Sequence, residues 1–205
     1  MGRPLVAMLV ARGHRVRALA RERSAAKLPA GVEPVIGNAL DASTYAAHVA
    51  PCDTLVHLVG TPHPSPAKAA AFREVDLASV AAAVHAANAA EVRHFVYVSV
   101  AQPAPVMRAY IEVRRKGEAL LAQSGIAATI LRPWYVLGPG HRWPIVLKPL
   151  YALFEALPAT RDSARRLGLV TLEQMIASLV HAVEHRPARE RILDVPALRA
   201  ASLAS

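Results

Sequence analysis

The sequence predicts an α/β fold built on a doubly wound parallel sheet, and two observations lead to it. Short apolar runs alternate with helical patterns along most of the 205 residues, and parallel strands need such crossover helices to join them. In addition, the run at 54–59 is almost continuously apolar, which is typical of parallel strands covered on both faces, and residues 92–100 indicate another buried strand. We therefore expect right-handed β-α-β crossovers around one sheet.

The predicted elements follow from residue spacing and from the glycines that end them. Leu5, Met8 and Leu9 share one helical face before Gly13, and residues 14–21 then alternate as a strand. Further strands are predicted at 32–36, 54–59, 92–100, 128–136 and 191–195, and helices at 67–90, 110–124 and 171–186. The last helix opens with a capping box of Thr171 and Gln174. Residues 141–166 form an apolar region broken by prolines, and we expect a loose tail after residue 195.

The composition limits the kinds of partner. The net charge is +9, but the arginines are spread along the chain without a nucleic-acid motif, so we expect no nucleic-acid interface. Cys52 is the only cysteine, which excludes a disulfide framework and suits a reducing, cytoplasmic compartment. No apolar run reaches the ~18 residues of a membrane span. Residues 1–21 are rich in arginine and lack acids, as transit peptides do, but the change of pattern at Gly13 favours a folded unit.

Four short motifs occur in a set order: GNALD at 37–41, LVG at 58–60, YIEVRRKGE at 110–118 and LRPWYVLGPG at 131–140. With them the chain resembles an atypical short-chain dehydrogenase/reductase, of the branch shared by NAD-dependent epimerase/dehydratase-like and NmrA-like proteins. It is also similar to the cofactor-holding accessory subunits of respiratory complex I. The resemblance implies a Rossmann-like NAD(P)-binding domain at 1–140 and a small substrate lobe at 141–205, packed against the sheet.

The resemblance also implies which residues hold the dinucleotide. Gly2 matches the third glycine of the family's T-G-x-x-G-x-x-G loop, which lets the pyrophosphate sit on a helix N-terminus. Asn38 stands where the family has an acid that binds adenine, and an amide can also hold a base edge. Gly60 lies where the backbone passes close to the cofactor. The implied cofactor-binding residues are Gly2, Arg21, Asn38, Ala39, Val59, Gly60, Ser99, Tyr110, Arg114 and Pro133.

Arg21 bears on the choice between NAD and NADP. It ends the second strand of the implied fold, where a carboxylate would accept the 2′-hydroxyl of NAD. An arginine can instead pair with the 2′-phosphate of NADP, so the sequence favours NADP as cofactor over NAD. The alternative interpretation of Arg21 is an exposed arginine at a strand end.

The implied catalytic residues are Ser99, Tyr110 and Arg114. The family uses a Tyr-x-x-x-Lys pair on one helix face, in which the lysine lowers the tyrosine pKa and the tyrosine moves the substrate proton. Here Arg114 replaces the lysine and supplies charge with a different geometry, while Lys116 points to another face. Ser99 matches the family's serine at a strand end. An enzyme would therefore use Tyr110 as the acid/base, Arg114 as its electrostatic partner and Ser99 to position substrate.

The first strand and most of the glycine loop of such a fold are missing from the sequence. In the usual strand order the missing strand lies between the strands that end at Arg21 and Val59, so these two would be left about 10 Å apart with unpaired backbone. A misplaced start codon or a fragment is therefore expected.

Two functions remain open, and a third possibility is that the chain as written binds no cofactor well, because the first strand of the fold is missing. The first is an NAD(P)-binding protein of the nucleotide-sugar epimerase/dehydratase type, an oxidoreductase if Tyr110 is active on a small-molecule substrate. The alternative is a non-catalytic cofactor-binding redox sensor or assembly subunit, which Arg114 favours. No metal site is expected, because His181 and His185 have helical spacing but no third ligand nearby. His57 is expected to be a core histidine.

Overall fold

The computed structural model describes residues 1–104, 106–138 and 166–202. The strands form three sheets, in which each strand is parallel to its neighbour. The main sheet has the order β3 (Thr54–His57), β4 (His94–Val98), β5 (Ala127–Leu131) and β8 (Glu190–Leu193). A second sheet pairs β1 (Val16–Ala20) with β2 (Val32–Ile36), and a third pairs β6 (Tyr135–Leu137) with β7 (Leu169–Thr171). The predicted parallel α/β class is confirmed.

The break between the first two sheets falls where the sequence predicts unpaired backbone. β1 pairs with β2 and β3 pairs with β4, and the described residues contain no ladder between β1 and β3. Burial follows this break. Four of the five residues of the interior strand β4 are buried, whereas none of the five in β1 is. An interior parallel strand is normally covered on both faces, so β1 has the burial of an edge strand.

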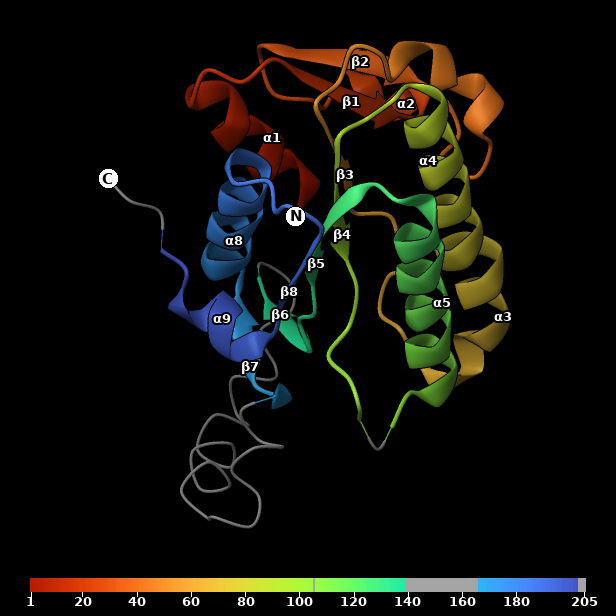
Figure 1. Cartoon of the computed structure of the whole chain (residues 1–205), viewed down its shortest axis with the longest axis vertical. Helices are drawn as coiled ribbons and strands as arrows, with labels where there is room; N and C mark the ends of the chain where they lie inside the picture. Colours follow the sequence, from red (N-terminus) through yellow and green to blue (C-terminus); the bar gives the residue numbers. More distant parts are fainter. Residues whose placement is uncertain (105, 139–165, 203–205) are drawn as a thin grey trace.

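Helices cover both faces of the sheets (Figure 1). One layer holds α1 (Gly2–Ala11), α8 (Leu172–Glu184) and α9 (Val195–Ala200), and the other holds α3 (Ala69–Ala71), α4 (Ala78–Ala89) and α5 (Arg108–Ser124). The short helix α2 (Glu22–Ala25) joins β1 to β2. In the first layer Leu5 and Leu9 of α1 pack in one cluster with Val16 of β1 and Val56 of β3. This apolar contact therefore bridges the two sheets.

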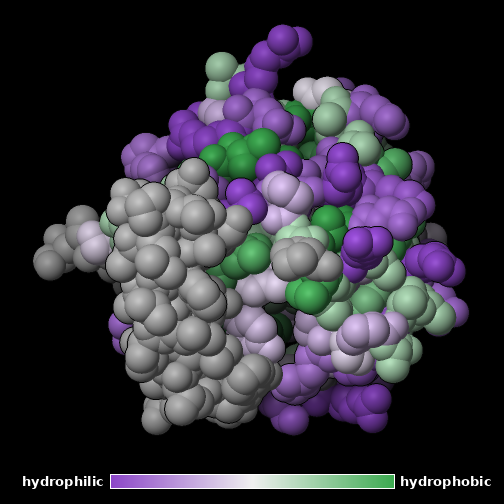
Figure 2. Space-filling model, turned by 90° about the horizontal axis from the view of Figure 1, so that it is seen from below, coloured by the Kyte–Doolittle hydropathy of each residue, from purple (hydrophilic) through white to green (hydrophobic). Residues whose placement is uncertain are grey.

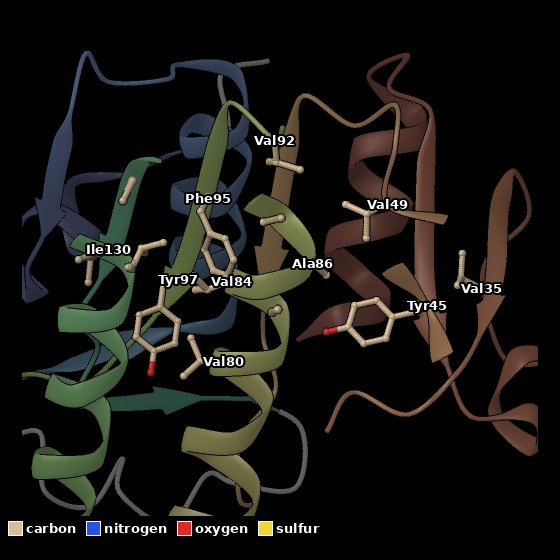
Figure 3. Packing of buried hydrophobic residues seen from close by; sticks show 14 residues of the cluster. Val35, Tyr45, Val49, Val80, Val84, Ala86, Val92, Phe95, Tyr97 and Ile130 are labelled. Atoms are coloured by element: carbon tan, nitrogen blue, oxygen red, sulfur yellow. The ribbon is translucent and has the colours of Figure 1, made fainter. Parts of the chain in front are cut away.

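The second layer has its own core (Figure 3). Phe95 and Tyr97 of β4 pack there with Val80 of α4. Tyr45 and Val49 reach the same cluster from the segment that holds the 3-10 turns η1 (Ala42–Thr44) and η2 (Ala46–His48). The β1–β2 half is thus attached to the main sheet through side chains on both faces.

Three local differences from the predicted elements have physical causes. The helix expected at 67–90 begins as the 3-10 turn η3 (Pro66–Lys68) and contains a π-helical turn, η4 (Phe72–Leu77), which inserts an extra residue into the turn. The strand expected at 128–136 is divided into β5 and β6 around Pro133, which lacks a backbone donor. The tail is α9 instead of loose chain, because the Asp194 side chain caps it by accepting from the Ala197 amide.

The segment after residue 140 contributes to the main layers where it is described. β8 pairs with β5, and α8 packs beside α1. The capping box of α8 is confirmed, since the Thr171 hydroxyl accepts from the Gln174 amide and the Gln174 side chain accepts from the Thr171 amide. The apolar region predicted at 141–166 lies almost wholly outside the described residues, and the division at residue 140 stays a prediction. No helix in the described ranges is long and apolar enough to span a bilayer.

Candidate dinucleotide site at the strand ends

Most of the predicted cofactor residues follow the carboxyl end of a strand. Arg21 follows β1, Asn38 follows β2, Gly60 follows β3 and Ser99 follows β4. In a doubly wound sheet these ends share one edge, and ligands bind in the crevice outside it. Figure 2 shows the molecule from below, and the described part of this face carries a few hydrophobic residues among hydrophilic ones. The sequence prediction therefore places its site residues on one side of the fold.

The N-terminus of α1 lies at the same place. A Cβ on Gly2 would lie 3.9 Å from the Leu58 Cδ1 atom, just beyond β3. Within the described residues no side chain caps this helix, so the amides of its first turn have no side-chain acceptor there. A helix N-terminus of this kind attracts anions through its dipole and its amides. Gly2 and α1 can therefore serve the pyrophosphate of a dinucleotide.

Arg21 and Asn38 are exposed at the ends of the β1–β2 sheet. The Arg21 backbone is the N-cap of α2, and no side-chain hydrogen bond of Arg21 is found within the described residues. The side-chain oxygen of Asn38 accepts from the Leu40 amide at 3.1 Å, which leaves its NH2 group as a donor. Ala39, the next predicted contact, is half-buried. These groups fit the polar edge and ribose of an adenosine.

Arg114 occupies the centre of the site at the end of the main sheet. Its side chain is 6% exposed, and its Nη2 atom donates to Asp76 Oδ1 at 2.6 Å. The Nη1 atom donates to the Val98 carbonyl at 2.9 Å and to the Val59 carbonyl at 3.5 Å. The guanidinium therefore ties α5 to the ends of β3 and β4 and to η4.

Asp76 is itself fully buried, and it also holds the loop after β3. Its Oδ2 atom accepts from the Thr61 amide at 3.0 Å and from the Thr61 hydroxyl at 2.5 Å. Gly60 lies directly over this ion pair, because an added Cβ would overlap Arg114 Nη2 and lie 3.2 Å from Asp76 Oδ1. The close approach requires a residue without a side chain at position 60.

Tyr110 stacks on the same cation. The Arg114 Cζ atom lies 5.1 Å from the centre of the Tyr110 ring, and the Phe72 ring lies 4.9 Å from it on the π-helical turn. Burial raises the pKa of Tyr110, and Arg114 opposes that rise. The resemblance implies a lowered tyrosine pKa, so the shift of the Tyr110 pKa has the opposite direction to the implied one. Lys116 pairs instead with Glu112 on the exposed face of α5, as its spacing predicts.

Ser99 belongs to a second polar network. Its hydroxyl donates to Glu118 Oε1 at 2.5 Å. The same carboxylate accepts from Gln102 at 3.0 Å and from Arg132 at 3.0 and 2.6 Å. The structure therefore joins Tyr110 to Arg114, while the Ser99 hydroxyl is engaged with Glu118. Pro133 is buried, and its carbonyl accepts from the Ala101 amide at 2.9 Å.

Sequence reasoning missed the two carboxylates that organise the site. Asp76 is an acid within a long apolar and alanine-rich stretch, 67–90, and a buried charge in such a stretch needs a partner. This acid in an apolar stretch could have indicated Asp76 as the partner of a buried cation. Glu118 lies four residues after Arg114, which predicts only a shared helix face.

The histidines have structural surroundings. His57 is buried in β3, with its Nε2 atom 3.2 Å from the Ser79 hydroxyl, which confirms its expected place in the core. Within the described residues its buried Nδ1 atom has no hydrogen-bond partner. Burial lowers the pKa of His57 to about 3, and the Arg114 charge acts in the same direction. His181 and His185 lie with ring centres 4.1 Å apart. In the described parts of the chain no group of three or more His, Cys, Asp or Glu could hold a metal ion.

Residues 1–146 match the model of a family described as NAD(P)H-binding. The chain belongs to this NAD(P)H-binding family. The match includes α1 and the ends of β1 to β5, where the predicted cofactor residues lie. The exposed Arg21 and Asn38, the uncapped N-terminus of α1 and the side-chain-free Gly60 fit such a cofactor. No curated protein matches the sequence.

Solved structures with the same fold include enzymes in complex with NAD. The Bordetella bronchiseptica enzyme WbmH in complex with NAD+ has a TM-score of 0.67 and 17% identity, covering 93% of this chain and 70% of its own. A UDP-galactose 4-epimerase has a TM-score of 0.69 and 17% identity, with coverage of 94% and 72%. The dTDP-glucose 4,6-dehydratase DesIV of Streptomyces venezuelae, with NAD bound, has a TM-score of 0.67 and 18% identity, with coverage of 93% and 71%. These similarities show the Rossmann-like fold.

Proposed function

We propose that the chain binds an NAD(P)(H) dinucleotide across the carboxyl ends of β1 to β4 and does not carry out the proton transfer of the Tyr-x-x-x-Lys enzymes. The observation that supports this proposal is the buried Asp76–Arg114 ion pair. The cation at the lysine position is held by a carboxylate and a backbone carbonyl, at 2.6 and 2.9 Å. It therefore serves the fold, and this supports a non-catalytic cofactor-binding protein, such as a redox sensor or an assembly subunit.

The neighbouring groups support the same proposal. A general base needs a pKa near the working pH, whereas burial raises the pKa of Tyr110. The Ser99 hydroxyl donates to Glu118 and is engaged before any substrate arrives. Arg114 also cannot release a proton as a lysine can. Each of the three candidate catalytic groups therefore has a structural role.

The proposed binding mode uses the chain's own groups. The amides of the first turn of α1, beginning at Gly2, would receive the pyrophosphate. Asn38 and Ala39 would contact adenine, and Arg21 would meet the adenosine ribose, or the 2′-phosphate of NADP. Val59, Gly60 and Pro133 would line the nicotinamide end. We propose NADP as the preferred form, on the support of the exposed Arg21.

The second candidate is an oxidoreductase that acts on a nucleotide-sugar-like carbonyl or alcohol. It is supported by the positions of Tyr110 and Gly60, which both lie against Arg114 at one strand edge. A bound nicotinamide would supply or accept the hydride. Tyr110 would then donate or take the substrate proton, Arg114 would be its electrostatic partner, and Ser99 would have to leave Glu118 to position substrate.

Titration calorimetry with NADPH, NADH and the oxidised forms, followed by turnover assays on a panel of carbonyl substrates, tests both candidates. We expect binding in the micromolar range without turnover, and Tyr110→Phe should leave the binding unchanged. Arg21→Ala should weaken NADP(H) more than NAD(H). Turnover that Tyr110→Phe abolishes would replace the first candidate with the second, and failure to bind any of the four dinucleotides would contradict both.

A further inference from the structure

Arg114 is surrounded by side chains from four elements, and these determine the net charge of the site. Asp76 comes from η4, Tyr97 from β4, Tyr110 from α5 and His57 from β3. Burial raises the pKa of both tyrosines and lowers that of His57 to about 3, so these three groups are neutral near pH 7. The charge of Glu118 also raises the pKa of Tyr97, but Glu118 forms its own ion pair with Arg132.

Asp76 is therefore the counter-charge of Arg114. Both side chains are more than nine-tenths buried, at 0% and 6% exposure, so solvent screens their charges little. The carboxylate lies 2.6 Å from the guanidinium, and the pair as a whole has no net charge. Removal of the carboxylate alone would leave one buried positive charge beneath Gly60.

The nicotinamide ring makes such a charge measurable. The oxidised ring carries a positive charge and the reduced ring is neutral, so an uncompensated cation nearby repels the first and leaves the second unaffected. Gly60 and the end of β4 lie directly beside Arg114. In the proposed binding mode this is the nicotinamide end of the site, because the adenosine end lies at β1 and β2.

We propose that Asp76 is a specificity-determining residue: by cancelling the charge of Arg114 it allows the site to accept the oxidised as well as the reduced dinucleotide. This inference rests on the proposed cofactor binding. At the family's lysine position, Arg114 then carries a charge that is neutralised inside the protein. The neutralising residue, Asp76, lies on another element.

The test measures the ratio of the dissociation constants of the oxidised and the reduced dinucleotide by titration calorimetry at pH 7.5. Asp76→Asn should raise this ratio about tenfold, as expected for one unit charge at a few ångströms in a partly screened interior. Arg114→Gln should lower the ratio, because it removes the cation and keeps the carboxylate. The double variant Asp76→Asn/Arg114→Gln, which is neutral again, should return to within about threefold of the wild-type ratio.

Asp53→Asn is the matched control, because Asp53 is 79% exposed and pairs with the exposed Arg93. It should leave the ratio unchanged. A wild-type ratio in Asp76→Asn, or a double variant that behaves like Asp76→Asn, would overturn the proposal. Circular dichroism establishes that each variant is folded. If Asp76→Asn does not fold, the ratio of the dissociation constants in Arg114→Gln tests the proposal instead, and a wild-type ratio there would overturn it.

A second readout needs no cofactor. Arg114 lowers the pKa of Tyr110 and Asp76 raises it, so the Tyr110 phenol of Asp76→Asn should ionise at a lower pH than in the wild type. Ultraviolet titration follows this, with Tyr110→Phe in each background to assign the signal. A superimposable titration would refute the charge compensation, even if no dinucleotide bound and the proposed function had failed separately.

Discussion

Gly60→Ala tests whether the ion pair holds the loop after β3. The added Cβ would overlap the Arg114 Nη2 atom and lie 3.4 Å from its Cζ atom. The backbone itself does not oppose alanine, since the positive-φ glycines of the described chain are Gly13, Gly31 and Gly125. The guanidinium cannot move aside freely, because Asp76 and the Val98 carbonyl hold it at 2.6 and 2.9 Å.

Displacement of one member of a buried pair lowers the free energy of unfolding by about 3 kcal/mol. For a chain of this size that corresponds to a fall of about 10 °C in Tm. Urea denaturation and thermal melting measure both quantities. Gly138→Ala is the matched control, because the described residues place only Leu172 near its Cβ, at 3.8 Å. If Gly60→Ala unfolds within 1 kcal/mol of the wild type, the loop is not held in this way.

The remaining predictions concern stability. Thr171→Ala removes the cap of α8 and should lower the free energy of unfolding by about 1 kcal/mol, with little change in the urea dependence. The hydrogen bond from Arg12 lowers the pKa of Glu184 to about 2, so its contribution is present above pH 4.5 and is lost as the pH falls towards 2. Glu184→Gln should flatten that acid limb of the urea midpoint. Burial keeps His57 neutral with a pKa of about 3, so the unfolded chain takes up a proton that the native chain cannot between pH 6.5 and 3, and stability falls as the pH falls through that range. His57→Gln should reduce this slope, and an unchanged slope would contradict the assigned burial.

The strands and helix caps could be predicted because their signals are local. The second strand, β2, has the predicted bounds, 32–36, before the glycine that ends it, and the capping box of α8 needs two residues three positions apart. The break beside β1 could also be predicted, because it follows from strand order. The pairing of β6 with β7 could not, since 31 residues separate Leu137 from Leu169 and the three residues of β7 carry too little periodicity.

The candidate site was predictable only in part, for the same reason. The positions of Gly60, Tyr110 and Arg114 at one edge follow from motif order. The ion pairing of Arg114 does not follow from it, because the partner Asp76 is 38 residues away in sequence. Asp76 lies in a π-helical turn that places it beside Arg114. The engagement of Ser99 by Glu118 is likewise a tertiary contact between residues 19 positions apart. Both contacts change the chemistry that the motif implies.

The division of the strands into two sheets has a consequence for local opening. β1 and β2 are joined to the main sheet by apolar contacts, and the described strands share no ladder across the break. They therefore form a candidate cooperative unit of low stability. We expect amide hydrogens in β1 to exchange faster than those in β4. A dinucleotide bound as proposed would touch both units, at Arg21 and at Gly60. Its binding would then be visible as slower exchange in β1, far from the nicotinamide end, because the ligand would couple the opening of one sheet to that of the other.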